Sequence, residues 1–585
     1  MNKRRIIKMK VSDYIVNFIV NQGIHDIFGY QGTMIAHFVD SIYKNNHIKN
    51  HTCYNEQGAA FAAVGYAKAS DKIGVAYATS GPGAMNLMSG IADAYFDSIP
   101  TVFITGQLNL YEYTNIPTLR QQGFQELDVI SSVKSYTKYC TQIMDKNDIR
   151  YELEKAFYIA QDGRKGPVVL DIPMNIQREE IELNKLKSFQ PKIKNINNRQ
   201  YDIIADKILE NIKNAERPLL LIGNGVKKNS NEHKLIKELI EKLNIPTITS
   251  LPARHLFDIN DNLFFGYIGA AYGFREANII AYKKTDLIIS IGCSMCKRQI
   301  GQNNENFAKN AKIIRIDFDK EELKRKVHEN ELSYCIDYQG VIKKLIEKID
   351  FIIEKEWLDT CLFIKNTMRK FDRTLKERNI NRIMNKISSY FNENLSVFVD
   401  VGQHQMWAAQ SYETKENQQM LFSGGHGAMG FSIPAAIGGY YATGNRCIAL
   451  CGDGSIQMNI QELQWIFREQ IPIFIFVFNN ESLGLIRQQQ NDFFNRLYYG
   501  SNNENGYTVP SFTKIAKAYS LQSYKVHNEK ELHNAINNSD KTKPCLFEIL
   551  VDINSEAFPK TFFGEEMYNQ RPYLSKDIMD KILKI

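Results

Sequence analysis

Two polar side chains follow two consecutive predicted strands in the last third of this 585-residue chain. Residues 446–450 form a short strand that ends at Cys451-Gly452-Asp453-Gly454-Ser455, and the apolar run 471–478 ends at Asn479-Asn480. Continuous apolar runs are typical of parallel strands buried on both faces. Because open α/β sheets bind ligands at the carboxyl ends of their strands, we expect Asp453 and Asn480 to lie together at one sheet edge.

The residue types at this edge suit a hard cation that bridges a diphosphate. Mg²⁺ takes carboxylate and amide oxygens, such as those of Asp453 and Asn480, together with phosphate oxygens. Gly452 and Gly454 would let a phosphate approach the backbone, and the helix predicted to begin near Ser455 presents its positive end. Alone, Gly-Asp-Gly-Ser is equally compatible with a tight turn capped by an aspartate. The second polar strand end is what makes a magnesium site the sharper interpretation.

A second candidate, Glu56, begins a predicted helix made mostly of small residues. The helix continues through Gln57-Gly58-Ala59-Ala60-Phe61-Ala62-Ala63-Val64-Gly65-Tyr66-Ala67, so it could pack closely against another backbone. A glutamate in a first turn is most often explained by its interaction with the helix dipole. By its position alone, Glu56 therefore remains an ordinary first-turn acid.

These candidates need a framework of parallel strands, and the chain repeats a strand–glycine turn–helix pattern throughout. Further strands are predicted at 26–30, 74–78, 100–107, 166–173, 218–222, 245–250, 286–292, 312–317 and 397–401. The repetition predicts an α/β protein of three doubly wound parallel-sheet domains. We expect these domains at residues 1–185, 200–345 and 375–560. A linker at about 186–200, a charged helical connection at 340–380 and a C-terminal tail at 561–585 complete the chain.

Composition excludes several other classes of protein. The net charge of +7 is spread along the chain without a long basic block, so we expect no nucleic-acid partner. No apolar run approaches the ~20 residues that span a bilayer, and the basic start is not followed by a signal-peptide core. The 9 cysteines are scattered, which is typical of reduced thiols, and the single pair Cys293/Cys296 is expected to be structural. A cytoplasmic enzyme without membrane contact is the expectation.

Several motifs resemble, in order and spacing, the acetolactate synthase branch of the thiamine-diphosphate enzymes. They are NEQGAAFAAVGYA (55–67), VGQHQMWAAQ (401–410), SGGHGAMGF (423–431) and GDGSIQMNIQEL (452–463), with FGYQG, SGPGAMN, GFQE and GPVVLDIP in the first domain. The resemblance covers nearly the whole chain. It implies a pyrimidine-binding domain, then a central domain that often holds FAD, then a diphosphate-binding domain. It also implies active sites shared between subunits, hence a homodimer or homotetramer.

The resemblance implies roles for individual residues. Glu56 would contact the aminopyrimidine ring and promote proton loss from the thiazolium carbon. The other catalytic candidates, which would face the reacting carbons, are Gly32, Gln107 and Gln125. Residues that would hold the cofactor are Gly402, Gln403, His404, Gly427, Met429, Gly452, Gly454 and Ser455, with Met429 bending it. Asp453, Asn480 and the backbone carbonyl of Ser482 would bind Mg²⁺. His426 is as compatible with a neutral packed residue as with a proton shuttle.

Three segments depart from the family pattern. Gln31 and Thr33 replace the Pro and second Gly of the turn that the family commonly writes GYPGG. Gln489 stands where the family has a substrate-shaping Trp. The flavin-contacting segment becomes residues 292–301, in which only Arg298 and the glycines remain. We therefore expect a polar acceptor side, where Gln489 or Arg487 could bond an acceptor hydroxyl, and we still expect FAD.

Three classes of function follow. The leading one is a carboligase that decarboxylates pyruvate and transfers the two-carbon unit to a second carbonyl. The acceptor is either pyruvate, giving acetolactate, or a keto-sugar, giving a branched sugar for surface polysaccharide. The alternatives are a flavin-dependent oxidoreductase similar to pyruvate oxidase, and a non-catalytic homologue. The presence of Glu56, Asp453 and Asn480 argues against the last.

Overall fold

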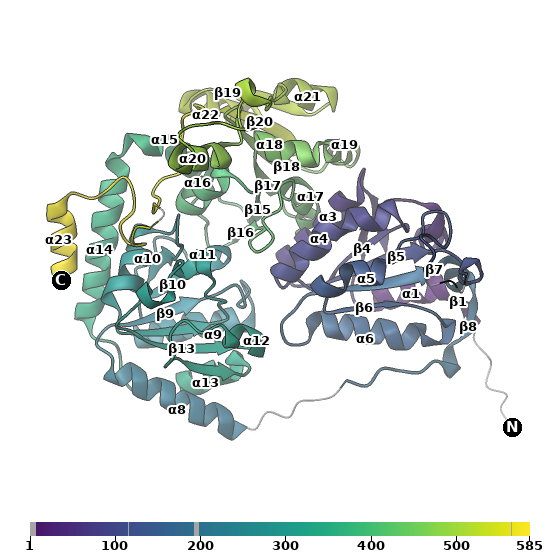
Figure 1. Ribbon diagram of the computed structural model, residues 1–585, viewed down its shortest axis with the longest axis horizontal. Coiled ribbons are helices and arrows are strands. Elements are labelled where there is room, and N and C mark those ends of the chain that lie inside the picture. The colour runs from purple at the N-terminus through teal and green to yellow at the C-terminus, as the bar shows by residue number, and fades with distance from the viewer. Residues whose placement is uncertain (1–7, 115, 117, 192–197, 563) are drawn as a thin grey trace.

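Three six-stranded parallel sheets, each flanked by helices, make up the molecule (Figure 1). The computed structural model describes residues 8–114, 116, 118–191, 198–562 and 564–585. The first residues, on which the signal-peptide prediction depends, and much of the predicted linker lie outside the described residues. The prediction of three doubly wound α/β domains is confirmed. Their residue boundaries stay predictions.

The first and third sheets have the same strand order. In both, the strands lie side by side as second, first, third, fourth, sixth and fifth of their domain. The first sheet contains β2 (Asp26–Gly29), β3 (Lys49–Thr52), β4 (Gly74–Ala78), β5 (Thr101–Gln107), β6 (Tyr139–Gln142) and β7 (Pro167–Pro173). The third contains β15 (Leu395–Val399), β16 (Gln418–Phe422), β17 (Cys447–Gly452), β18 (Ile473–Asn479), β19 (Gln522–Val526) and β20 (Cys545–Leu550).

The central sheet has a different order, β11-β10-β9-β12-β13-β14. Its strands are β9 (Pro218–Ile222), β10 (Thr247–Thr249), β11 (Phe264–Tyr267), β12 (Leu287–Ile291), β13 (Lys312–Asp317) and β14 (Leu332–Cys335). This is the 3-2-1-4-5-6 arrangement of dinucleotide-binding folds, in which the order reverses between the first and fourth strands. A ligand crevice is therefore expected above β9 and β12.

Helices cover both faces of each sheet. The first domain has α1 (Val11–Asn21), α2 (Ala36–Lys44), α3 (Glu56–Ser70), α4 (Pro82–Phe96), α5 (Val129–Val133), α6 (Ile149–Gln161) and α7 (Met174–Arg178). The central domain has α8 (Asn198–Asn214), α9 (Asn231–Leu243), α10 (Arg275–Ile279), α11 (Lys297–Ile300), α12 (Lys320–Lys324) and α13 (Tyr338–Lys348). The long helix α14 (Lys355–Thr374) leads to the third domain.

The third domain contains α15 (Asn379–Ser389), α16 (Gln403–Ser411), α17 (Ser432–Thr443), α18 (Asp453–Met458), α19 (Leu463–Arg468), α20 (Gly484–Phe493), α21 (Phe512–Ala518) and α22 (Glu529–Asn538). The chain ends with α23 (Lys576–Lys584), and β1 (Lys8–Lys10) pairs antiparallel with β8 (Glu180–Glu182).

Helices α3 and α17 join the first and third domains (Figure 1). A Cβ placed on Gly65 of α3 would stand 2.1 Å from the carbonyl oxygen of Ala435, and one on Gly438 of α17 would stand 1.8 Å from that of Ala62. The two backbones are thus in direct contact. The small residues predicted to permit close helix packing do so here.

The helix predicted to begin near Ser455 has apolar residues at helical spacing as far as Phe467, but it is broken at Asn459. Its φ of −138° and ψ of 36° end α18, and its side-chain amide donates to the carbonyl oxygen of Gly430 (2.9 Å) and to Gln57 Oε1 (3.1 Å). Both partners come from distant parts of the chain, so the apolar spacing could not reveal the break.

The C-terminal segment packs against the central domain. Gln570 donates to the carbonyl oxygen of Gly273 (2.8 Å), Asn278 donates to that of Met567 (3.0 Å), and Lys284 donates to that of Leu583. The described residues 561–562 and 564–585 therefore dock on the central domain. Among the described helices, none is both long and apolar enough to cross a membrane.

Candidate active site

The loops after three adjacent strands of the third sheet form one half of the candidate site. The strands β15, β17 and β18 are hydrogen-bonded neighbours. They end just before Gly402, at Gly452 and at Asn479, respectively. Parallel neighbours place these ends at one edge, so the residues that sequence spacing predicted to meet are brought together.

Asp453 is held rigidly at this edge. Its Oδ2 accepts bonds from the backbone N–H groups of Asn480 (3.1 Å) and Ser482 (3.3 Å), and its Oδ1 accepts one from the Tyr507 hydroxyl (2.9 Å). Burial raises the pKa of Asp453 to about 6, although these three bonds act in the opposite direction. A buried carboxylate of this kind is stabilised by a nearby cation.

Three oxygen atoms, one each from Asp453, Asn480 and Ser482, converge at this edge of the sheet. The side-chain oxygen of Asn480 lies 2.8 Å from the carbonyl oxygen of Ser482 and 3.1 Å from Asp453 Oδ2, while the amide nitrogen donates to Gln403 Oε1 (3.1 Å). Adjacent ligands of an octahedral Mg²⁺ with bonds of 2.0–2.1 Å are about 2.9 Å apart. The donor set and its spacing therefore fit Mg²⁺. Without a cation, rotating the amide would place its NH₂ group there instead.

His404 supplies an unused polar atom next to this site. A Cβ on Gly402 or Gly452 would stand within 2.9 Å of its imidazole Nδ1, so both glycines are needed to admit the ring. His404 is buried, and no hydrogen-bond partner for its Nε2 exists in the described part of the chain. Burial lowers the pKa of His404 to about 3, which keeps it neutral. A neutral imidazole with a free Nε2 fits a diphosphate oxygen.

The two other predicted diphosphate residues already have protein partners. The amide nitrogen of Gln403 donates to Gln488 Oε1 (3.0 Å) and to the carbonyl oxygen of Ser555 (2.9 Å). The hydroxyl of Ser455 accepts from the backbone N–H of Gly452 (2.8 Å). These bonds show that both side chains stabilise the loop. A phosphate would bind the backbone groups of Gln403 and Ser455, or their side chains after these bonds break.

The loop that carries Met429 is fixed by Asp400. The Asp400 carboxylate accepts bonds from the backbone N–H groups of Gly430 (2.9 Å) and Ser432 (3.1 Å), and burial raises its pKa to about 6. Within this loop, Gly427 has a φ of +72°, which favours glycine. The loop therefore holds Met429 in a defined position without a regular element.

The Met429 side chain lies close to Gly454, next to Asp453. A Cβ on Gly454 would stand 3.2 Å from Met429 Cε and 2.9 Å from both Leu483 Cδ2 and the Tyr507 hydroxyl. Gly454 thus packs against the side chains of Met429, Leu483 and Tyr507. Tyr507 and Leu483 were missed by the sequence analysis, since no spacing links them to Asp453.

The first domain builds a second half-site around Glu56. Asn86 Nδ2 donates to Glu56 Oε2 (2.9 Å), and a Cβ on Gly83 would stand 3.0 Å from Glu56 Oε1. Gly83 and Gly32 both approach the Thr79 side chain. Glu56, Gly32 and the Ser80–Gly83 turn are therefore neighbours, at the carboxyl ends of β2 and β4.

The two predicted glutamines of the first domain differ. Gln125 is half-buried with a φ of +61°, and a Cβ on Gly81 would stand 2.7 Å from its carbonyl oxygen, so it lies at the glycine turn. Gln107 is 1 % exposed, and its amide nitrogen donates to the carbonyl oxygen of Leu127 (2.9 Å) and to Asp171 (3.2 Å). These contacts favour a positioning role for Gln107.

The Glu462 side chain of the third domain contacts the N-terminal end of α3. Glu462 accepts bonds from the backbone N–H groups of Tyr54 and Asn55, each at 3.1 Å, directly before Glu56. Burial raises the pKa of Glu462 to about 7. Sequence spacing gave no signal for this contact, because Glu462 lies far from Tyr54 along the chain.

Comparison with known proteins decides the family. The chain matches the N-terminal TPP binding domain of thiamine pyrophosphate enzymes over residues 9–132, their central domain over 205–345 and their C-terminal TPP binding domain over 400–549. The chain belongs to the thiamine pyrophosphate enzymes. Their diphosphate-binding region coincides with the Asp453 half-site, and their N-terminal region with the Glu56 half-site.

Within this family the chain is similar to acetolactate synthase large subunits. It is 33% identical over 575 residues to a probable large subunit of Methanococcus aeolicus, covering 94% of this chain and 93% of that protein. A probable large subunit of Methanocaldococcus jannaschii is 33% identical over 608 residues, with 99% and 98% coverage. The large subunit of Lactococcus lactis is 32% identical over 559 residues, with 94% and 93% coverage. The chain is thus an acetolactate synthase-like thiamine pyrophosphate enzyme.

The two residues of this thiamine pyrophosphate enzyme that were predicted to contact the acceptor lie on α20. Gln489 is exposed between exposed Ile486 and Phe493, on one face of the helix. Arg487 is buried on another face, where it donates to the carbonyl oxygen of Ile553 and to Asn554 Oδ1, both at 2.8 Å. Of the two predicted acceptor contacts, only Gln489 is free to reach a substrate.

In the central domain, Arg298 is exposed on α11, beyond the end of β12. Gly292, directly after β12, has a φ of +58°, and its carbonyl oxygen accepts a bond from the backbone N–H of Gly225 (3.1 Å). The strand exits above β9 and β12 therefore touch. Within the described residues, the Arg298 side chain makes no hydrogen bond or ion pair.

Proposed function

We propose that this chain is a carboligase that decarboxylates pyruvate on thiamine diphosphate and transfers the two-carbon unit to a second carbonyl. The observation that carries the proposal is the group of three converging oxygens from Asp453, Asn480 and Ser482, with a neutral His404 beside it. Bound thiamine diphosphate supplies an electron sink for decarboxylation and for forming the new C–C bond. The proposal gives each half-site one task.

The third domain binds and shapes the cofactor. Asp453, Asn480 and the Ser482 carbonyl hold Mg²⁺, and His404 Nε2 together with the Gly402, Gln403, Gly452, Gly454 and Ser455 backbone meets the diphosphate. Met429, supported by the loop at Gly427, would pack against the bound cofactor and favour its bent form. These assignments are supported by the oxygen spacing, the unpaired imidazole nitrogen and the contact of Met429 with the Gly454 region.

The first domain handles protons. Glu56 would contact the aminopyrimidine and hold or release a proton at its carboxylate, which Asn86 orients through the 2.9 Å bond. Gly32 and Gln125 leave space for the reacting carbons, and Gln107 supports that wall from inside the domain. General acid–base groups placed in this way contribute about 10²–10⁴-fold to rate.

We further propose that the active unit is a homodimer or a homotetramer. The side-chain partners of Glu56 and of Asp453 come from their own domains, and several large apolar side chains near them are exposed. Met85 on α4 and Met458 on α18 are 56% and 53% exposed. A second subunit would cover these side chains and bring the Glu56 half-site of one chain to the Asp453 half-site of the other.

The acceptor is either pyruvate or a keto-sugar, and Gln489 favours the hydroxylated one. Its exposed amide can bond an acceptor hydroxyl, whereas the apolar neighbours Ile486 and Phe493 can pack against carbon atoms. A keto-sugar product would be a branched sugar of the kind used in surface polysaccharide. The reaction takes place in the cytoplasm, consistent with nine free cysteines.

The central domain is proposed to bind FAD. Its 3-2-1-4-5-6 strand order, the glycine contact at Gly225 and Gly292, and the free Arg298 guanidinium support a dinucleotide at this crevice. The contact also occupies the Gly225 N–H, so the pyrophosphate would depend on Arg298. The flavin would be structural, because carboligation needs no net electron transfer.

Mass spectrometry of the products tests the function. Purified enzyme with thiamine diphosphate, Mg²⁺ and pyruvate, with and without a keto-sugar, should give CO₂ and one C–C-bonded product for each acceptor used. Acetate or acetyl phosphate as the main product, with anaerobic bleaching of a yellow protein by pyruvate, would instead establish the oxidoreductase alternative. Colourless protein that does not bind added FAD would reject the flavin part alone.

A further inference from the structure

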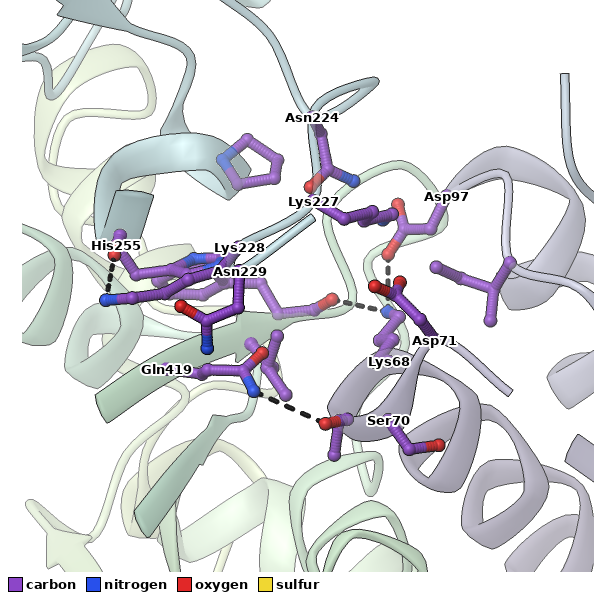
Figure 2. Close-up of a pocket in the computed structure, with 15 residues that line it drawn as sticks. Lys68, Ser70, Asp71, Asp97, Asn224, Lys227, Lys228, Asn229, His255 and Gln419 are labelled. Carbon is purple, nitrogen blue, oxygen red and sulfur yellow. Dashed lines mark hydrogen bonds and ion pairs between the residues drawn. The ribbon is translucent and has the colours of Figure 1, made fainter. Parts of the chain in front are cut away.

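A pocket of about 240 Å³ lies where the three domains meet, away from the residues of both half-sites (Figure 2). The first domain contributes the C-terminal end of α3 with Lys68 and Asp71. The central domain contributes the loop after β9 with Lys227 and Lys228, and the third domain contributes Gln419 of β16. Pockets for drug-sized molecules usually exceed ~300 Å³, so this one suits a smaller ligand.

Two lysines of the central domain line the pocket without carboxylate partners. Lys228 is 8% exposed and donates to the carbonyl oxygens of His255 and Gln418, both at 2.7 Å. Lys227 is half-buried, and within the described residues its ammonium group makes no hydrogen bond or ion pair. Burial lowers the pKa of each lysine to about 8, because each positive charge is poorly compensated.

The buried acids near the pocket, Asp93 and Asp97, are already bonded to other groups. Asp97 binds Lys68 Nζ (2.6 Å) and accepts bonds from the backbone N–H groups of Gly424 and Gly425. Asp93 also binds Lys68, at 3.3 Å. Asp71 is exposed and only partly offsets the charge of Lys227. Within the described residues, Lys227 and Lys228 therefore have no carboxylate in direct contact, and Asp71 and Asp97 offset the charge of Lys227, and Glu416 that of Lys228, only from a distance.

Polar groups around the lysines can complete an anion site. His255 lines the pocket, is 5% exposed, and its Nδ1 has no partner in the described chain. Burial lowers the pKa of His255 well below its usual range, so the ring is neutral and can donate from Nδ1 in one tautomer. The amides of Asn224 and Asn229 stand at the same opening (Figure 2).

We infer that this junction pocket binds a small oxyanion, a phosphate or a short-chain carboxylate, through Lys227, Lys228 and His255. A compact anion would pair with the free ammonium group of Lys227 and satisfy the unpaired imidazole nitrogen. Charge-assisted bonds of this kind are about twice as strong as neutral ones.

The pocket is connected to both half-sites. Lys68 donates to the carbonyl oxygen of Phe422 (2.6 Å), directly before the loop that carries Met429, and Gln419 Nε2 donates to the carbonyl oxygen of Ala69 at the end of α3 (3.3 Å). Glu56 stands at the other end of the same helix. An anion bound here would hold the central domain against the two domains that form the active site.

The test is binding by the full-length protein, measured by calorimetry and by thermal unfolding. Phosphate and pyruvate are titrated separately at constant ionic strength, with chloride as the comparison anion. We expect saturable stabilisation by phosphate or by pyruvate, and the stronger of the two identifies the source of the oxyanion. Lys227→Gln should weaken binding by about tenfold or more, Lys227→Arg by less, and the exposed control Lys234→Gln should bind as wild type.

The ligand-free variants provide a second readout. Lys227→Gln removes a poorly compensated charge, so without an anion its melting temperature should equal or exceed that of wild type. Binding should also weaken between pH 7 and pH 9 as Lys227 loses its proton. The charged groups that act on it are Asp71, Asp97, Lys68 and Lys165.

Three results would overturn the inference. Equal stabilisation by chloride would show only an ionic-strength effect, and unchanged affinity in Lys227→Gln would show that the anion binds elsewhere. Loss of FAD from Lys227→Gln would assign these lysines to the flavin instead. Because the readout is binding, failure of the carboligase proposal would leave this result unaffected.

Discussion

The first and third domains are two versions of one topology that serve different chemistry. After the first strand they present Gly32 and Gly402, and after the third strand they present the Ser80–Gly83 turn and the Gly452–Ser455 turn. After the fourth strand they present Gln107 and Asn479. Between the second and third strands, one domain begins α3 with Glu56, and the other has the Met429 loop and α17.

What differs is the set of groups that each edge places around its carboxylate. The third domain buries the Asp453 carboxylate beside two further oxygens, an arrangement that a divalent cation stabilises. The first domain surrounds Glu56 with glycines and the Asn86 amide, an arrangement suited to a neutral organic ring. The same strand exits can thus hold a charged or an uncharged part of one cofactor, depending on a few side chains.

The largest expected effect comes from removing the Asp453 carboxylate of the third domain. Asp453→Ala should leave a folded protein that no longer binds thiamine diphosphate in a Mg²⁺-dependent manner, a loss of at least about 100-fold. Calorimetry with and without Mg²⁺ measures it, and Asp540→Ala, an exposed carboxylate of the same domain, is the control. Unchanged cofactor affinity would contradict the metal assignment.

Substitution of Glu56 in the first domain should lower turnover and leave the affinity for the cofactor unchanged. Glu56→Gln keeps the shape and the bond from Asn86 but cannot share a proton, so turnover should fall about 10²–10⁴-fold with cofactor affinity retained. Steady-state kinetics beside the same calorimetry checks both. Activity within about twofold of wild type would mean that Glu56 does not take part in proton transfer.

Mixing the two variants tests whether the halves meet between subunits. In a heterodimer, one site would combine both defects and the other would be intact, so random subunit exchange should restore about a quarter of wild-type activity. Activity after mixing, compared with each variant alone, is the measurement. If no activity returns although exchange is shown by mass, both halves would have to come from one chain.

The contact between the two domains can be disturbed directly. Gly438→Ala places a Cβ against the carbonyl oxygen of Ala62, so the free energy of unfolding should fall by about 2 kcal/mol or more. Chemical denaturation measures it. A change below about 0.5 kcal/mol would show that α3 and α17 can move apart without cost.

The smallest expected effect concerns the acceptor. Gln489→Trp should shift the ratio of turnover toward pyruvate over a keto-sugar by about tenfold, because a hydrogen bond to the acceptor is lost and an apolar wall is gained. Competition between the two acceptors, followed by mass spectrometry, measures the ratio. Gln489→Leu separates the two causes, since it removes the bond without adding the ring. An unchanged ratio in both variants would favour acetolactate formation.

The sequence was sufficient for most of the strands, their parallel arrangement and the meeting of Asp453 with Asn480, although it missed β3, β6, β11, β14, β16, β19 and β20. These follow from apolar runs and from the rule that parallel strand ends share an edge. It was not sufficient for Tyr507, Asp400 or Glu462, whose partners are set by the folded chain. The break at Asn459 belongs to the same class, because the apolar spacing continues through it.

Single positions show a further limit. Arg487 was a candidate acceptor contact by its position near Gln489, but positions two residues apart in a helix lie on nearly opposite faces, and Arg487 lies on the buried face. The residues beyond 560 likewise gave no sign of where they would pack. Met567, Leu574 and Ile582 are buried in the core of the central domain, and Gln570 bonds to Gly273 there.

The contact of α3 with α17 has a mechanical consequence. Because backbone meets backbone at Gly65 and Gly438, the first and third domains of one chain should behave as a single rigid body. Opening of the site for substrate entry must then use segments outside this body. Residues 118–128, among them Phe124, which is 80% exposed, lie outside this body, and movement on the microsecond-to-millisecond scale should concentrate there.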